Sequence, residues 1–372
     1  MAVSPSLNDQ SVVPGLKNPL QQANNLLKGK VHTAVQKSHA HLPIQAGVLT
    51  PFPQHLDIEL TNVCNLRCVM CPRNEMTRKL GFMPTEVFKR IVDEMAVHSA
   101  NTPMEGVWLH LYGESILHPE FIELTRYMRH TVPNLPYIGM STNCTYLDEK
   151  HCNLVLDSGL TRLVLSIDGA NKETYEKIRV RGDFEEVTEN ARRFLRMREE
   201  RGAEFPRVRM QIIRMKETES EIEQFRQQWQ PLLRPTDVMY IKKFTDFGGQ
   251  VADRSVQQQW SEWKNMTVNL PSACGLTYFA LAIHYNGDVV ACCFDVHGEM
   301  KLGNVMEQSL VDIWHGAAFQ EIREAHLSRR LDKLPLCAKC DEIQRDVAIG
   351  DLAREDARRV VHKLDFIRRG RN

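Results

Sequence analysis

The residues with the clearest chemical potential are three cysteines that fall within eight positions of one another. Cys64, Cys68 and Cys71 form a Cys-x-x-x-Cys-x-x-Cys spacing. Their thiolates are soft ligands, which select zinc or an iron–sulfur centre over harder ions. A structural zinc site closes with four ligands, whereas a cubane held by three cysteines leaves one iron open to an exogenous ligand. The spacing therefore favours an iron–sulfur centre with an open iron, and the alternative is a zinc knuckle that borrows a His or a distant Cys.

A second group of cysteines lies in the C-terminal third of the chain. It consists of Cys274, the adjacent pair Cys292 and Cys293, and the Cys-x-x-Cys pair Cys337 and Cys340. A Cys-x-x-Cys pair with two distant cysteines has the composition of a tetrathiolate site, which holds either zinc or a fully ligated [4Fe–4S] cluster. Because this group offers five cysteines for four positions, Cys292 and Cys293 compete for one of them.

Composition limits where these thiols can act. The chain has 372 residues, with 47 Lys and Arg, 47 Asp and Glu, and ten cysteines. Zero formal net charge predicts no binding to nucleic acid or to an acidic membrane surface, because both need a cationic field. We find no apolar run that could cross a membrane and no secretory signal, so we expect a cytoplasmic protein. A reducing compartment disfavours disulfides, which leaves metal binding or catalysis for the cysteines.

The segments that must position the first three cysteines alternate between short apolar runs and longer amphipathic stretches. We predict strands over residues 56–61, 107–112, 137–142, 162–167, 208–214 and 238–244. We predict helices over residues 85–98, 119–130, 148–158, 184–201 and 219–233. This alternation is typical of βα units around a parallel sheet. The three cysteines follow the first strand, at the edge where parallel sheets bind their ligands.

The predicted strands set the fold class and the domain organisation. Six strands are too few for a complete eight-stranded barrel, so we predict an α/β fold over residues 51–250, either a partial, open (β/α)6 barrel or a doubly wound sheet. Residues 1–50 are polar and broken by prolines, and we predict a partly disordered leader. Residues 251–345 hold a hairpin signal at Asn286-Gly287 and the second cysteine group, which predicts a small loop-rich domain. Residues 346–372 are predicted to form a basic amphipathic helix.

The cysteine spacing after the first strand, followed by the (β/α)6 rhythm, resembles the radical S-adenosylmethionine (SAM) superfamily from about residue 56 to residue 342. The resemblance implies a partial (β/α)6 barrel and a [4Fe–4S] cluster on Cys64, Cys68 and Cys71. It also implies that SAM chelates the open iron through its amino and carboxylate groups. In this family, reductive cleavage of SAM gives a 5′-deoxyadenosyl radical that abstracts a substrate hydrogen. The role of the protein is then to bind and orient the reactants and to exclude water, while the cofactor carries out the radical chemistry.

Polar stretches at the ends of successive predicted strands resemble the family's SAM contacts. Tyr112-Gly113-Glu114 resembles the Gly-Gly-Glu motif that holds the SAM ammonium, with Tyr112 in place of the first glycine. The other SAM contacts that the resemblance implies are Met70, Ser141, Asn143, Ser166, Asp168, Arg179 and Ile212, the last within a stretch, 211–213, expected beside the adenine. Alone, each stretch is typical of a turn. Their order supports a site, because such sheets bind ligands at the carboxyl ends of their strands.

The second cysteine group, with its hairpin and Trp314, resembles the SPASM/twitch extension of radical SAM enzymes. The full SPASM form needs further cysteines after the Cys-x-x-Cys pair, so we expect the shorter twitch form with one auxiliary [4Fe–4S] cluster. The implied ligands are Cys274, Cys292, Cys337 and Cys340, with zinc as the alternative metal. Cys293 is then a buried spectator, the ligand in place of Cys292, or a hydrogen-atom donor to a substrate radical, as a radical epimerase requires.

These features predict a radical SAM enzyme, and the resemblance narrows its reaction. Twitch-type relatives act on aminocyclitols and sugars, so we expect hydrogen abstraction from a small carbohydrate-, aminocyclitol- or nucleoside-like substrate. The outcome is dehydrogenation, epimerisation or a related oxidation, and a low-potential flavodoxin or ferredoxin is the expected electron donor. Candidate substrate contacts are His284, Tyr285, Asp295, His297 and Lys243. The alternatives are a peptide-modifying radical SAM/SPASM maturase and a non-catalytic iron–sulfur or zinc protein.

Overall fold

The computed structural model describes residues 49–251, 274–328 and 330–340. Most of the predicted leader and the whole predicted C-terminal helix lie outside these residues, as does the segment that follows the predicted domain boundary at residues 250–251. All of the described residues belong to one compact unit, Ile44–Asn372. None of the helices in this described part has the length and apolar character to cross a membrane.

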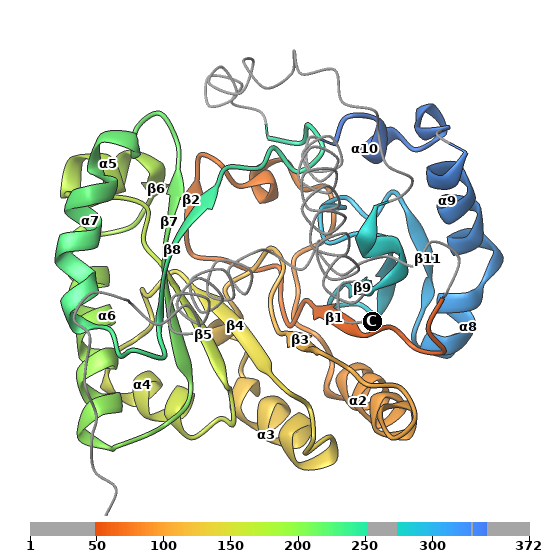
Figure 1. Cartoon of the computed structure of the whole chain (residues 1–372), viewed down its shortest axis with the longest axis horizontal. Helices are drawn as coiled ribbons and strands as arrows, with labels where there is room; N and C mark the ends of the chain where they lie inside the picture. Colours follow the sequence, from red (N-terminus) through yellow and green to blue (C-terminus); the bar gives the residue numbers. More distant parts are fainter. Residues whose placement is uncertain (1–48, 252–273, 329, 341–372) are drawn as a thin grey trace, which may run out of the picture. The chain divides into compact units, whose positions relative to one another are not determined.

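A nine-stranded sheet runs through the described residues, in the order β11-β10-β9-β1-β3-β4-β5-β7-β8 (Figure 1). Six of its strands are parallel and follow one another in chain order. These are β1 (His55–Ile58), β3 (Gly106–Trp108), β4 (Ile138–Thr142), β5 (Arg162–Ser166), β7 (Arg207–Arg214) and β8 (Val238–Lys243). These strands correspond to the six predicted strands. The helices lie on one side of the sheet, and this arrangement confirms the predicted α/β fold, a partial (β/α)6 barrel.

The helices that connect these strands largely match the predicted ones. They are α2 (Thr85–Ser99), α3 (Phe121–Thr131), α4 (Glu149–Leu156), α6 (Phe184–Glu200) and α7 (Ile222–Trp229). α7 is shorter than predicted because 3-10 turns at Glu219–Glu221 and Gln230–Leu232 flank it. A seven-residue helix, α5 (Lys172–Ile178), was not predicted. It begins where the side chain of Asn171 accepts a hydrogen bond from the backbone of Thr174.

The alternation of side chains along the parallel strands separates two faces. Leu163, Leu165 and Met210 are fully buried and belong to the main core, which lies between the sheet and the helices. Residues that alternate with these, such as Trp108, Ser141 and Gln211, share the opposite side of the sheet, which we call the inner face. The carboxyl end of the inner face is therefore where the predicted ligand-binding residues must meet.

The C-terminal part extends the barrel sheet instead of forming a sheet of its own. β9 (Ala280–Ile283) pairs in parallel with β1, with Ala282 opposite Asp57. The chain reverses at the predicted Asn286-Gly287 turn, where Gly287 has a φ of +85°, into β10 (Asp288–Val290) and β11 (Lys301–Asn304). Three helices follow: α8 (Leu310–His315), α9 (Ala317–Leu327) and α10 (Pro335–Ala338).

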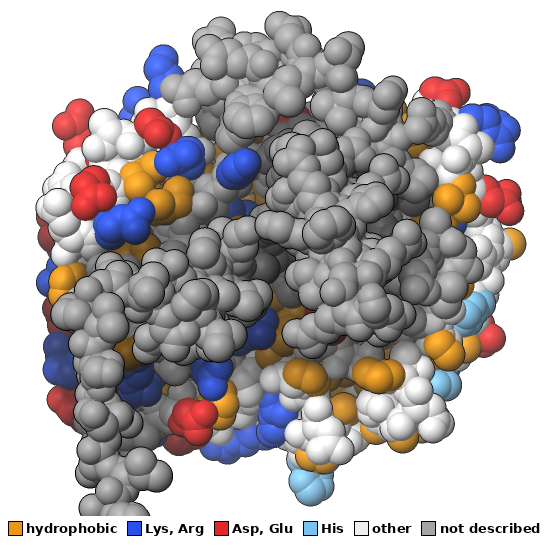
Figure 2. All heavy atoms as spheres, viewed as in Figure 1, with side chains coloured by type: hydrophobic (Ala, Val, Ile, Leu, Met, Phe, Trp, Pro, Cys, Tyr) orange, Lys and Arg blue, Asp and Glu red, His pale blue; other side chains and the backbone are white. Residues whose placement is uncertain are grey.

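Charged side chains of both signs share the exposed surface. Lys and Arg side chains lie next to Asp and Glu side chains at the left and right edges of the view in Figure 2. Exposed ion pairs such as Lys172–Glu185 and Arg214–Glu219 belong to this surface. Such exposed pairs contribute about 0–1 kcal/mol each, so they add little to the stability of the fold.

Candidate active site

The three closely spaced cysteines lie on the loop that leaves the carboxyl end of β1. Within this loop, β2 (Arg67–Cys68) pairs antiparallel with β6 (Arg179–Val180), which places Cys68 opposite Arg179. The backbone of Cys71 donates to the carbonyl of Cys68 at 3.0 Å, which tightens the loop. Cys68 is buried, and Cys64 and Cys71 are partly buried. The fold therefore gathers the three thiols at the end of the first strand, as predicted.

The surroundings of these thiols fit a cationic metal centre. Burial raises the pKa of all three, that of Cys71 to about 12, so without a metal the thiols stay protonated. Two buried donors aim at the sulfurs: Arg179 Nη1 lies 3.6 Å from Cys68 Sγ, and Asn143 Nδ2 lies 3.8 Å from Cys64 Sγ. Such outer hydrogen bonds orient cysteine ligands and stabilise their thiolate form.

No three cysteine sulfurs among the described residues lie as close together as the ligands of a mononuclear zinc site. Tetrahedral zinc, with Zn–S bonds of about 2.3 Å, holds its sulfurs about 3.8 Å apart. Among the described residues, the only group of three or more metal-ligating atoms that lie within 4.8 Å of one another is an acidic one, Glu176, Asp183 and Glu185. No three of the described cysteine sulfurs meet this limit. A cluster tolerates wider spacing, because each thiolate binds a different iron.

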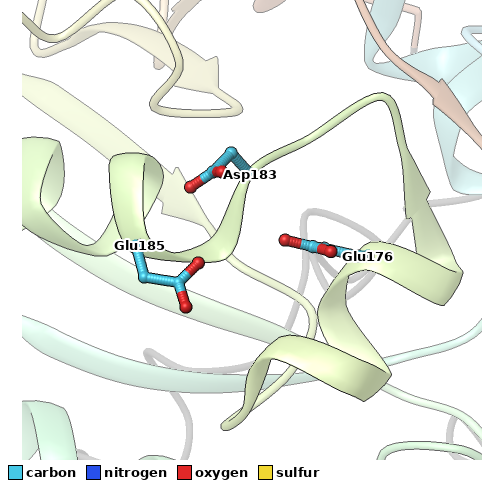
Figure 3. A group of neighbouring side chains, drawn as sticks. All are labelled: Glu176, Asp183 and Glu185. Atoms are coloured by element: carbon cyan, nitrogen blue, oxygen red, sulfur yellow. The ribbon is translucent and has the colours of Figure 1, made fainter.

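The three acidic side chains lie near one another (Figure 3), and each has a partner within the protein. Asp183 caps α6 by accepting a hydrogen bond from the backbone of Glu186 at 2.8 Å. Glu176 accepts from the backbone of Phe184 at 3.3 Å. Lys172 Nζ lies 2.9 Å from the Glu185 carboxylate and 3.6 Å from that of Glu176. These caps and ion pairs account for the cluster, and we assign it no metal.

Glu114 follows β3 and offers a buried, partly satisfied carboxylate. Its Oε2 accepts a hydrogen bond from the backbone of Asn143 at 2.8 Å, whereas its Oε1 is buried and has no hydrogen-bond partner. Burial raises the pKa of Glu114 to about 7. A buried acceptor without a partner is costly, and an ammonium group would satisfy both its hydrogen bonding and its charge.

Gly113 lets this carboxylate approach the cysteine loop. A Cβ at this position would lie 2.1 Å from the carbonyl oxygen of Thr61 and 2.8 Å from that of Val63. The backbone of Glu114 also donates to the Val63 carbonyl, at 2.9 Å. Only glycine allows this close approach of two backbone segments.

Four of the residues predicted at strand ends form one buried network beside Cys68. Arg179 Nε donates to Asp168 at 2.8 Å, and its Nη2 donates to Ser166 Oγ at 2.6 Å. Asp168 also accepts from the backbone of Ile213 at 2.7 Å, and Gln211 Nε2 lies 3.2 Å from Ser166 Oγ. Asp168 has no exposed surface and Arg179 is 8% exposed. The network thus ties β5, β6 and β7 to the cysteine loop.

The structure places three further residues that were expected to contact SAM. Ile212 is fully buried in the core between sheet and helices, so its side chain faces away from the site. Because β7 alternates, Gln211 and Ile213 are the side chains of this stretch that face inward. The adenine contact of residues 211–213, including Ile212, remains a prediction. Met70 packs in a small cluster beside the cysteine loop, and Ser141 lies on the inner face. Both positions are compatible with the predicted SAM contacts.

The second cysteine group is assembled from three segments. Cys292 Sγ accepts a hydrogen bond from the backbone of Phe294 at 3.4 Å, a contact typical of a metal-bound thiolate. The pKa of Cys292 is raised well above its usual value by a hydrogen bond with Cys293 and by burial, with a further contribution from Cys274. Burial and the charge of Asp295 raise the pKa of Cys337 to about 11. Cys340, two residues after α10, is buried.

A buried polar group between the two cysteine-bearing regions was not predicted as a unit. Arg78 pairs with both oxygens of Glu59, at 2.7 and 2.8 Å. His284 follows β9, is 1% exposed, and has no partner for either ring nitrogen. A Cβ at Gly298 would lie 3.5 Å from His284 and 3.6 Å from Arg78, so the two side chains border the same space. No local motif identifies this group, because Glu59, Arg78 and His284 come from three separate segments.

Comparison with known proteins decides the family. Residues 58–227 match the family model of the radical SAM superfamily, and residues 274–341 match that of SPASM, an iron–sulfur cluster-binding domain. The chain belongs to the radical SAM superfamily. It is a radical SAM enzyme that uses SAM and [4Fe–4S] clusters, and its C-terminal part is a SPASM domain.

Its radical SAM relatives act on different substrates. The mycofactocin maturase MftC of Mycobacterium tuberculosis is 25% identical over 301 residues, which cover 73% of each chain. The SAM-dependent 2-deoxy-scyllo-inosamine dehydrogenase of Niallia circulans is 20% identical over 290 residues, or 77% of this chain and 92% of that one.

Solved structures show the same radical SAM fold. SuiB of Streptococcus suis, bound to the precursor peptide SuiA, has a TM-score of 0.57 and 15% identity, covering 85% of this chain and 74% of SuiB. BtrN in complex with AdoMet and 2-DOIA has a TM-score of 0.51 and 18% identity, covering 77% of this chain and 92% of BtrN. At these identities the likeness is one of fold alone.

The residues of the site fit the cofactors of the family. Cys64, Cys68 and Cys71 would hold the cluster with the open iron, and Glu114 offers the acceptor for the SAM ammonium. Cys274, Cys292, Cys337 and Cys340 would hold one auxiliary cluster, which remains a prediction, as does the choice of Cys292 over Cys293. When bound, SAM and the open cluster supply the radical that removes a hydrogen atom from the substrate.

Proposed function

We propose that this radical SAM enzyme dehydrogenates a carbon that bears a hydroxyl or amino group, on a small carbohydrate-, aminocyclitol- or nucleoside-like substrate. Oxidation of an alcohol carbon to a carbonyl removes one hydrogen atom, one electron and one proton. The bound cofactors supply the acceptors for the hydrogen atom and the electron. The chain itself must therefore supply a group that accepts the proton from the hydroxyl.

The observation that carries this proposal is the buried imidazole of His284, whose two ring nitrogens have no partner. Buried polar atoms are nearly always hydrogen-bonded, so such a ring points to a ligand with a donor or an acceptor. Burial lowers the pKa of His284, which keeps the ring neutral at pH 7 and able to take up a proton. The neighbouring carboxylate of Glu59 favours the resulting imidazolium.

A second histidine on the inner face offers a donor in a fixed tautomer. His110 Nδ1 accepts a hydrogen bond from the backbone of Ser141 at 3.2 Å, so its proton must be on Nε2. Burial lowers the pKa of His110 to about 4, which keeps this ring neutral as well. One donor and one potential acceptor suit a polyhydroxylated substrate, the class on which the 2-deoxy-scyllo-inosamine dehydrogenase acts.

Peptide modification is the second candidate function. The mycofactocin maturase MftC and the subtilosin biosynthesis protein AlbA of Bacillus subtilis, 23% identical over 322 residues, favour it. SuiB bound to its precursor peptide supports it through the fold. The buried position of His284, which is 1% exposed, favours a small substrate over a peptide.

Isotope transfer distinguishes the two candidates. The reconstituted enzyme is incubated anaerobically with SAM, a reductant and either a panel of aminocyclitols and hexoses deuterated at their carbinol carbons or the deuterated SuiA peptide. 2-Deoxy-scyllo-inosamine belongs to the first panel. We expect deuterium in 5′-deoxyadenosine, detected by mass spectrometry, from at least one member of that panel. Deuterium transfer from the peptide, together with none from the polyol panel, would overturn the proposal.

The role of His284 is tested by replacing it with glutamine. We expect His284→Gln to keep hydrogen abstraction but to slow carbonyl formation by about 100-fold or more, the loss typical of a missing general base. His326→Gln is the matched control, because His326 is 4% exposed and its Nε2 also has no partner, but it lies on α9. Equal product rates in the two variants would exclude His284 as the proton acceptor.

A further inference from the structure

The loop that follows Cys292 is attached to the barrel by three side-chain hydrogen bonds. The carbonyl of Cys293 accepts from Tyr112 Oη at 2.6 Å, that of Phe294 from Gln250 Nε2 at 2.6 Å, and that of Val296 from Arg78 Nε at 2.8 Å. All three donors precede the SPASM domain in the chain, and all three acceptors belong to it. We call these donors the loop clamp. Because they bind backbone carbonyls, they hold the path of the loop irrespective of its side chains.

Tyr112 differs from the other two members of the clamp in its position. It directly precedes Gly113 and Glu114, whose carboxylate has an unpartnered buried oxygen. Gln250 follows β8, and Arg78 follows the three-cysteine loop. Of the three, only Tyr112 lies on the segment that carries Glu114.

The path between Glu114 and Tyr112 has little room to deform. Gly113 lies against the carbonyl groups of Thr61 and Val63, where even a Cβ would be 2.1 Å from the nearer oxygen. The Tyr112 ring is 6% exposed, and the Arg78 guanidinium lies 5.8 Å from its centroid. A displacement of Glu114 is therefore transmitted to Tyr112 instead of being absorbed between them.

We propose that Tyr112 is a positioning residue that couples SAM binding at Glu114 to the position of the loop that carries Cys292 and Cys293. A cation bound to the Glu114 carboxylate restrains this segment, and the hydrogen bond from Tyr112 to the Cys293 carbonyl passes the restraint to the loop. Coupling of this kind is reciprocal, so the clamped loop also favours SAM binding. The inference rests on the family membership of the chain and does not depend on the substrate class.

Hydrogen–deuterium exchange of the reconstituted holoenzyme, with and without SAM, tests the coupling without turnover. The readout is the exchange rate of the amides in residues 293–300, relative to amides of α6. In the wild type we expect SAM to slow the loop amides. In Tyr112→Phe we expect about five- to tenfold faster exchange of the loop without SAM, because one buried hydrogen bond is lost. The effect of SAM on the loop should disappear in that variant.

Two matched variants separate coupling from simple attachment. Gln250→Leu removes another member of the loop clamp, so we expect faster loop exchange but a preserved response to SAM. Tyr137→Phe removes a buried hydroxyl that lies 3.0 Å from His55 Nδ1, away from the SPASM loop, and should alter neither quantity. Wild-type loop exchange that does not respond to SAM would overturn the proposal, even if Tyr112→Phe failed to fold. A SAM response that persists in Tyr112→Phe would overturn it as well.

Discussion

Replacing Gly113 with alanine should damage SAM binding more than it damages the fold. The added Cβ would lie 2.1 Å from the Thr61 carbonyl oxygen, 2.7 Å from the Thr61 carbonyl carbon and 2.8 Å from the Val63 oxygen. Ordinary contact needs about 3.5 Å or more, so the two backbone segments must separate by over about 1 Å. Overpacking of this kind costs about 3 kcal/mol, and for a chain of this size the melting temperature should fall by about 4 °C.

The same separation moves Glu114 away from the cysteine loop. The hydrogen bond from its backbone to Val63, at 2.9 Å, joins the two segments that the alanine forces apart. We therefore expect SAM to bind at least about tenfold more weakly, which corresponds to about 1.4 kcal/mol. Equilibrium dialysis of the reconstituted protein measures the affinity, and thermal unfolding measures the stability.

The control for Gly113→Ala is Gly202→Ala, at which a Cβ would meet nothing within 4 Å. Gly202 has a φ of +57°, so its replacement should cost about 1 kcal/mol in backbone strain and leave SAM binding unchanged. If Gly113→Ala melted within about 2 °C of the wild type and bound SAM with wild-type affinity, the close approach that places Glu114 would be refuted.

Three further predictions concern the SAM site and the second cysteine group. Because burial raises the pKa of Glu114 to about 7, protonation should remove its charge as the pH falls. SAM affinity should therefore drop about tenfold from pH 8 to pH 6. Binding titrations measure this change, and the SAM affinity of Glu114→Gln should not depend on pH in this range. Arg179→Ala leaves the fully buried Asp168 without its cation and should destabilise the protein by about 3–5 kcal/mol in denaturant unfolding, whereas a double replacement by apolar residues should cost less. Cys292→Ala should lower the iron content by about four atoms after anaerobic reconstitution, and Cys293→Ala should leave it unchanged; the reverse result would exchange their roles.

The parallel strands could be predicted because each is a short run rich in apolar residues, and all but β8 are largely buried. The predicted ends of the strands were less accurate than their positions in the chain. The predicted strand 107–112 stops at Trp108. Leu109 still donates to the Gly139 carbonyl of β4 at 2.8 Å, but the chain then leads to Gly113, which packs against the carbonyls of Thr61 and Val63. The pairing of β9 with β1 could not be predicted at all, since an apolar run such as Ala280–Ile283 identifies neither its partner nor its register.

Residues that come together only through the pairing of distant segments are also the site residues that are hardest to predict from the sequence. The cysteines and Glu114 lie in short motifs whose spacing carries the signal. Arg78 was not predicted, and His284 was predicted only as one of five candidate substrate contacts, because these two residues come from distant segments and no local pattern links them. The face on which the side chain of Ile212 lies could not be predicted, because a three-residue stretch at a strand end does not tell which side chain points inward; only the pairing of β7 with its neighbours does.

Tyr112 departs from the motif that identified the site, because it stands in place of the first glycine of Gly-Gly-Glu. A glycine in its place has no side chain, so it cannot donate to the Cys293 carbonyl, which Tyr112 reaches at 2.6 Å. The attachment of the SPASM loop through this position is therefore a property of this chain and not of the Gly-Gly-Glu motif. Arg78 lies 5.8 Å from the centroid of the Tyr112 ring and pairs with Glu59, and it borders Gly298 together with His284. Substrate specificity should accordingly respond to replacements among these residues more than to changes in the motifs that bind SAM.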